Sequence, residues 1–118
     1  MAFSDKNMKL LEMKAEVFAA LGHPIRLAAA EYLSQGERCV CDIAERVGAE
    51  QSNLSRHLAV MVKAGVLQSR KEGLRVIYRL KTPCLTNFLS CVTEVLREQL
   101  SENTKALRQL SPGEGAAS

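Results

Sequence analysis

The sequence predicts a small, mainly helical domain with one β-hairpin. Its 118 residues suffice for a single domain, and 47% of them are hydrophobic. The aromatic residues are only three Phe and two Tyr, so the core has to be aliphatic, which favours helices over a β-sandwich. Apolar residues recur at a helical period along most of the chain, but their period changes to two between residues 66 and 80.

The first two helices are separated by a break at Gly22-His23-Pro24. The first is predicted from Asp5 to Leu21, with Ser4 or Asp5 as its cap. Pro24 suits the first turn of the second, which runs to about Ser34 before Gly36 ends it.

The third and fourth helices form a helix-turn-helix pattern. The third is predicted over 40–47 and is closed by Gly48, and the fourth runs from Gln51 to Gly65. The short turn Gly48-Ala49-Glu50 joins them, and hydrogen-bonding side chains cover the exposed side of the fourth helix near its start.

The hairpin comprises strands over 66–70 and 74–80, with a turn at Lys71-Glu72-Gly73. Its basic tip fits a wing that lies along a DNA backbone. A last helix follows Thr82-Pro83 and runs to about Leu110, whereas 111–118 are expected to be a disordered tail. Residues 1–110 therefore predict a winged helix-turn-helix with the order α-α-α-α-β-β-α.

Both end helices carry more apolar surface than so small a domain can bury. We therefore expect them to form a two-fold homodimer, and the alternative is that they fold back on their own core. The longest apolar runs are too short to span a bilayer, and residues 1–11 contain no apolar segment ahead of a cleavage site. The expected location is the cytoplasm, away from membranes.

The net charge of +3 is distributed unevenly. Residues 1–50 carry −2, residues 51–81 carry +6 and residues 82–118 carry −1. A basic centre between acidic flanks is typical of a nucleic-acid-binding face, although a merely solvated positive face has the same charge.

Four blocks resemble the ArsR/SmtB family of metal- or thiol-responsive transcriptional repressors. They are residues 20–27, 36–44, 51–58 and 70–80, in the family's order and spacing. The resemblance implies a dimeric winged helix-turn-helix repressor, not an enzyme, which binds double-stranded operator DNA and is released by an inducer.

The resemblance also implies the DNA-binding residues. The recognition helix would be Gln51 to Ala64. Its expected contacts are Gln51, Ser52, Asn53, Ser55, Arg56 and His57, and those of the wing are Arg70, Lys71 and Arg75. Gln and Asn can pair with adenine and Arg with guanine, whereas Ser more often holds phosphates. For His57, a satisfied surface histidine is the alternative.

Cys39-Val40-Cys41-Asp42 matches the segment with which arsenic-, antimony-, lead- and cadmium-sensing members bind soft ions. Residues two apart in a regular helix point to nearly opposite sides, so both thiolates can share an ion only if the helix start is distorted. We expect Cys39 at the N-cap and Cys41 in the first turn, where the helix dipole favours thiolates. The ion would act as inducer, with no permanent cofactor.

Ala44 stands where many arsenic sensors have a third cysteine. Cys84 and Cys91 are the remaining candidate ligands. They are separated by about 10 Å of helix, so each would need a partner elsewhere, such as Cys39 and Cys41 or the other protomer. A two-thiolate site could instead suit a methylated arsenical, and Cys91 could be a buried apolar residue.

Other functions and other kinds of metal site are the alternatives to this interpretation. A redox or persulfide sensor of the same fold would use cysteine oxidation. A thiol oxidoreductase built on Cys39-Val40-Cys41 is disfavoured because no βαβ pattern surrounds the pair, and a dimeric interaction module would bind no DNA. A zinc, nickel or cobalt site in the last helix is disfavoured because no histidine follows His57.

Overall fold

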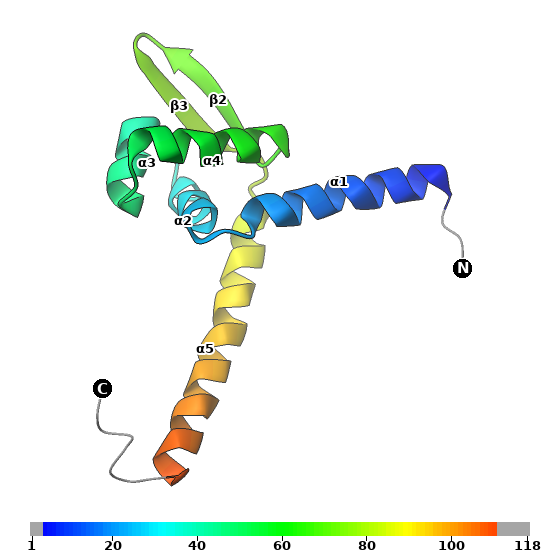
Figure 1. Ribbon diagram of the computed structural model, residues 1–118, viewed down its shortest axis with the longest axis vertical. Helices are drawn as coiled ribbons and strands as arrows, with labels where there is room; N and C mark the ends of the chain where they lie inside the picture. Colours follow the sequence, from blue (N-terminus) through cyan, green and yellow to red (C-terminus); the bar gives the residue numbers. More distant parts are fainter. Residues whose placement is uncertain (1–3, 111–118) are drawn as a thin grey trace. The chain divides into compact units, whose positions relative to one another are not determined.

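The computed structural model describes residues 4–110 as two compact units, which meet in sequence at Pro83 and Cys84. The first unit contains four helices and three strands, and the second contains one helix. Figure 1 labels the helices and the two longer strands. The predicted mainly helical fold with a β-hairpin is confirmed. The expected tail at 111–118 lies outside the described residues.

The helices of the first unit begin and end close to their predicted bounds: α1 is Asp5–Leu21, α2 Pro24–Leu33, α3 Val40–Val47 and α4 Gln51–Lys63. The Ser4 hydroxyl caps α1 by accepting a hydrogen bond from the Asn7 N–H at 3.3 Å. The ring of His23 caps α2 by accepting from the Ile25 N–H at 3.1 Å.

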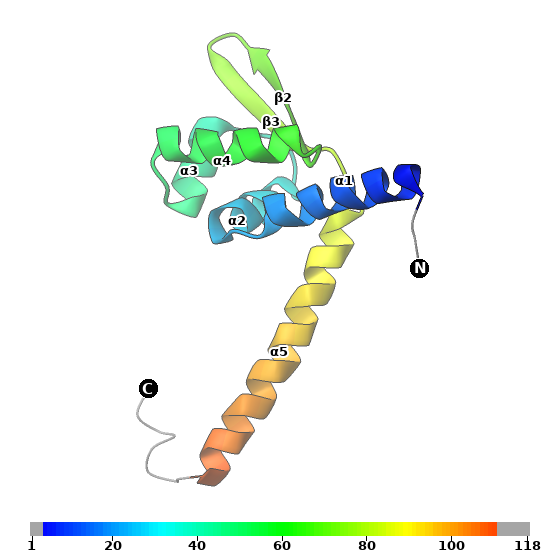
Figure 2. The same cartoon turned by 45° about the vertical axis from the view of Figure 1, so that its right-hand side comes forward.

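The core of the first unit lies between α2, α3, α4 and the base of the hairpin. Its fully buried aliphatic side chains include Ala29, Ala30, Ile43, Leu54, Leu58 and Met61. The last three recur at helical spacing, which fixes α4 with one side in the core and the other in solvent. In α1 only Ala20 and Leu21 are buried, and the N-terminal part of the helix projects beyond α2 and α4 (Figure 2).

The sheet contains a strand that the sequence did not indicate. Besides β2 (Leu67–Glu72) and β3 (Arg75–Leu80), Arg38–Cys39 forms β1, and the antiparallel order is β1-β3-β2. A two-residue strand is too short to show a period of two, because it is defined by its pairing with β3.

The hairpin turn also lies further along than predicted. Glu72 pairs with Arg75, so Gly73 and Leu74 make the turn and Lys71 belongs to β2. Gly73 has a φ of 66°, a conformation that side-chain-bearing residues rarely adopt. Its position, rather than the polarity of Lys71 and Glu72, therefore determines where the chain reverses.

The second unit contains α5, Leu85–Leu110, and the Cys84 carbonyl accepts a hydrogen bond from the Phe88 N–H at 3.4 Å. Several large apolar side chains of this helix are exposed, among them Val92, Val95, Leu96 and Leu100. Within residues 4–110, no helix has both the length and the apolarity required to cross a membrane.

Candidate DNA interface and cysteine site

The turn between α3 and α4 is formed by backbone hydrogen bonds. Gly48 ends α3 in the left-handed conformation (φ 71°), and both its N–H and that of Ala49 donate to the Ala44 carbonyl, at 3.0 and 3.1 Å. The Glu50 carbonyl then accepts from Leu54, which starts α4. Because Leu54 is fully buried, the orientation of α4 about its axis is fixed.

The polar side of α4 is exposed. Five of the six side chains predicted there to contact DNA lie in solvent: Gln51, Ser52, Asn53, Ser55 and Arg56. The Ser52 hydroxyl donates to the Glu50 carboxylate, so that this serine is already engaged at the helix start. The remaining four are available to hydrogen-bond donors and acceptors outside the molecule.

His57, the sixth predicted contact, is half-buried against the beginning of α2. Its Nδ1 accepts a hydrogen bond from Arg26 Nε at 3.1 Å, and its ring lies 4.3 Å from that of His23. Burial, followed by the positive charges of His23, Arg26 and Arg56, lowers the pKa of His57. These contacts favour the structural alternative for His57, and its DNA contact stays a prediction.

The wing arginines differ in their surroundings from Lys71. Arg70 forms ion pairs with Glu37 and Glu72, both at 2.9 Å, and Arg75 lies 3.9 Å from Asp42. Hydrogen bonding to Arg70 lowers the pKa of Glu37, and the same bond raises the pKa of Arg70. Lys71 is exposed and has no ion pair with any described residue.

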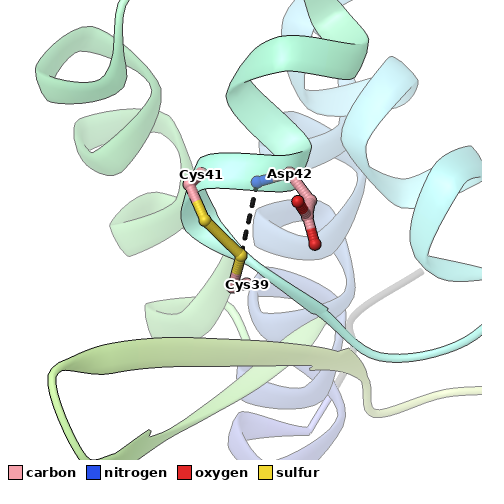
Figure 3. A group of neighbouring side chains, drawn as sticks. All are labelled: Cys39, Cys41 and Asp42. Atoms are coloured by element: carbon pink, nitrogen blue, oxygen red, sulfur yellow. Dashed lines mark hydrogen bonds between the residues drawn. A yellow bond between two sulfur atoms is a disulfide. The ribbon is translucent and has the colours of Figure 1, made fainter.

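Cys39 and Cys41 meet at the start of α3 (Figure 3). Cys39 is the N-cap with extended backbone (φ −78°, ψ 159°), so its side chain is not held at the helical angle. The two sulfurs are joined in a disulfide, with the Cα atoms 5.4 Å apart. The predicted positions in the N-cap and first turn are thus confirmed, and they explain how residues two apart can meet.

Asp42 completes a cluster of three possible ligands. One ligand atom from each of Cys39, Cys41 and Asp42 lies within 4.8 Å of the others. The Cys39 Sγ also accepts a hydrogen bond from the Asp42 N–H at 3.4 Å. Sequence reasoning did not select Asp42 as a ligand, although an N-cap and the residue three positions later are regularly adjacent in space.

The four cysteines differ in exposure. Cys39 is buried with 2% of its surface exposed, whereas Cys41 lies at the surface. Cys84, directly before α5, and Cys91, within it, are free and exposed. In the single chain Cys91 is therefore exposed, and its role as a ligand or as an apolar residue of a dimer interface stays a prediction.

Comparison with known proteins gives consistent matches. The model of the bacterial regulatory protein arsR family matches residues 23–69, which run from the N-cap of α2 into β2. The chain is 36% identical over 108 residues to the HTH-type transcriptional regulator Rv0081 of Mycobacterium tuberculosis (strain H37Rv), covering 91% of this chain and 95% of that protein.

Two further relatives bear on function. Over 66 residues the chain is 41% identical to the arsenical resistance operon repressor of Escherichia coli K12, covering 55% of this chain and 56% of that protein. The homodimeric winged helix-turn-helix DNA-binding domain of Mb0332 from Mycobacterium bovis superposes with a TM-score of 0.74 at 33% identity, covering 86% of this chain and 95% of that one.

Proposed function

Because the chain belongs to the arsR family of bacterial regulatory proteins, a family of DNA-binding transcriptional regulators, we propose that it is a repressor whose inducer binds at Cys39 and Cys41. The inducer would be a trivalent arsenical or antimonial, or a soft divalent ion such as Cd²⁺ or Pb²⁺. The observation that carries this proposal is the cluster of Cys39, Cys41 and Asp42 at the start of α3.

The DNA interface of the proposed repressor is α4 and the wing. Gln51 and Asn53 would read adenine, Arg56 guanine, and Ser55 would hold a phosphate. Ser52 would do the same only after its hydroxyl leaves the Glu50 carboxylate. A homodimer would present two copies of α4 to an operator with two-fold symmetry. The exposed apolar side chains of α1 and α5, such as Phe18 and Leu96, support this dimer.

The chemistry of the cluster suits a soft ion. Thiolates are the preferred ligands of such ions, and both cysteines lie at the start of α3. Reduction of the disulfide by a cytosolic dithiol, with transfer of two electrons and two protons, gives the two thiols that ligation requires. Asp42 supplies an oxygen that would suit a divalent ion better than arsenic.

Cys39 is well placed to transmit ligation. It belongs to β1, where it pairs with Ile77 of β3, and it also caps α3, which packs on α4. An ion that holds Cys39 and Cys41 at a new separation would therefore strain both the wing and the helix-turn-helix. If the DNA-free arrangement binds the ion better, binding of the ion releases DNA.

Cys84 and Cys91 remain proposed ligands. Their exposure leaves either thiol accessible to an ion, and a partner protomer could bring one of them to Cys39 and Cys41. If neither takes part, the two-thiolate site would favour a methylated arsenical, which needs fewer protein ligands.

A redox or persulfide sensor is the second candidate function. The observation that favours it is the Cys39–Cys41 disulfide itself. A hydropolysulfide or peroxide would take two electrons from the two thiols, which lose their protons as the S–S bond forms. In that case oxidation, rather than an ion, would change the start of α3.

A DNA-release titration can distinguish the two candidate functions. The DNA is a short duplex selected from a random pool by its binding to the protein, and the protein is reduced before the titration. Arsenite, antimonite, Cd²⁺, Pb²⁺ and a hydropolysulfide are added to wild type and to the variants Cys39→Ser, Cys41→Ser, Cys84→Ser and Cys91→Ser. Serine at position 39 can accept the same capping hydrogen bond, so this variant keeps the start of α3.

We expect a metalloid or metal ion to release the DNA from the wild-type protein. This release should be lost in Cys39→Ser and in Cys41→Ser. Loss in Cys84→Ser or Cys91→Ser as well would identify the third ligand. If none of the ions releases DNA and only the hydropolysulfide does, the ion-sensing proposal is wrong and the redox sensor replaces it.

A further inference from the structure

Arg70 is the most extensively bonded side chain of the wing. Its Nη1 and Nη2 donate to the two carboxylate oxygens of Glu37 at 2.9 and 3.0 Å. Its Nε and Nη2 donate to the Glu72 carboxylate at 3.2 and 2.9 Å. All three nitrogens of the guanidinium are therefore used within the protein.

Glu37 lies 33 residues from Arg70 in sequence and immediately before β1. Cys39 pairs with Ile77, which in turn pairs with Arg70, so these three side chains lie on one face of the sheet. The pair of Glu37 and Arg70 consequently bridges the two outer strands, β1 and β2, across β3.

The charges oppose a phosphate contact by Arg70. Two carboxylates neutralise the Arg70 guanidinium, and with the nearby charge of Arg79 the group of Glu37, Arg70, Glu72 and Arg79 has no net positive charge. A DNA phosphate would have to displace a bidentate carboxylate and approach a second one. Isolated ion pairs on the surface contribute little to stability. A bidentate Arg–carboxylate pair within a network of charges contributes more.

We propose that Arg70 is a positioning residue, which with Glu37 clamps the middle of the wing to the segment that carries Cys39. The clamp sets where the wing tip, with Lys71, meets the DNA backbone. This differs from the contact with the DNA backbone or the minor groove that the family resemblance implies for Arg70. The inference requires DNA binding but no inducer, so it stands or falls independently of the proposed ion site.

A charge swap tests the clamp. Arg70→Glu places three acids together, removes the clamp on the wing and is expected to weaken binding of the selected DNA duplex at least about tenfold. Adding Glu37→Arg restores an ion pair of reversed polarity, and binding should return to within about threefold of wild type. The matched control is Lys71→Glu, which should also weaken DNA binding. Adding Glu37→Arg to this control should restore less binding than it restores to Arg70→Glu.

The salt dependence of binding provides a second readout. Removal of a phosphate contact reduces the slope of log Kobs against log salt by about 0.9. Lys71→Gln should show this reduction, whereas Arg70→Gln should weaken binding while keeping the wild-type slope. Thermal unfolding of each variant, followed by circular dichroism, verifies that the proteins compared are folded.

The clamp is wrong if the swapped protein, although folded, binds as weakly as Arg70→Glu. It is equally wrong if Arg70→Gln loses the same slope as Lys71→Gln. Should the swapped protein fail to fold, the cycle of Glu37→Gln, Arg70→Gln and their double variant decides. A clamp predicts that the double variant is no weaker than either single one, whereas a phosphate contact predicts that Glu37→Gln binds DNA more tightly.

Discussion

His57 connects the recognition helix to α2 through a hydrogen bond that only its neutral ring can accept. Its neutral ring accepts the hydrogen bond from Arg26, and Arg26 also donates to the carbonyls of Ala19 and Ala20 at the end of α1, both at 3.4 Å. One side chain of α4 thus connects to two other helices. A protonated ring would carry a hydrogen on Nδ1 and would face Arg26, Arg56 and His23.

We predict that stability falls on acidification through this residue. Its pKa in the folded protein is below the ordinary 6.5, so near and below pH 6.5 the unfolded chain binds more protons and unfolding becomes more favourable. Above that range the contribution is constant. Urea unfolding across the pH range of histidine titration should show this slope in wild type and a smaller one in His57→Gln, whose amide oxygen still accepts from Arg26. An equal slope in both proteins would contradict the prediction.

At the scale of elements, the buried side of α4 orients the polar side that meets DNA. Leu58 is fully buried, so Leu58→Ala should lower the free energy of unfolding by about 2–5 kcal/mol. Val60, on the same helix, is 42% exposed, and Val60→Ala should change it by less than about 0.5 kcal/mol. Urea unfolding measures the free energy of unfolding of both variants. Equal losses of this free energy would contradict the prediction that burial separates the two sides of α4.

The elements also show what sequence alone can predict. Helix α3 was predictable because its apolar period and Gly48 are local signals. The strand β1 was not, because two residues become a strand only by pairing with Tyr78 and Ile77. The contact of Glu37 with Arg70 depends on that same pairing, and so it could not be predicted either. The meeting of Cys39 and Cys41 lies between these cases, since a capping position is local but the direction of its side chain is not.

At the scale of the whole molecule, the apolar side chains that the described chain leaves exposed require an explanation. Val92, Val95, Leu96 and Leu100 recur at helical spacing along one side of α5, and each is between 40% and 65% exposed. Such a stripe is typical of a helix that packs on another helix. The related Mb0332 domain is homodimeric, which makes a second copy of this chain the proposed partner.

We predict that a charge within this stripe separates the dimer. Leu96→Glu should convert the protein to a monomer in sedimentation equilibrium, because a buried carboxylate at the interface would lack a partner. Ser101→Glu is the control, since it adds the same charge to an exposed position of the helix about half a turn from the stripe. Loss of the dimer should also weaken binding to a DNA duplex with two half-sites far more than to one half-site, because only a dimer engages both. If Leu96→Glu remains a dimer, α5 does not supply the interface and the exposed apolar side chains of α1 become the candidates.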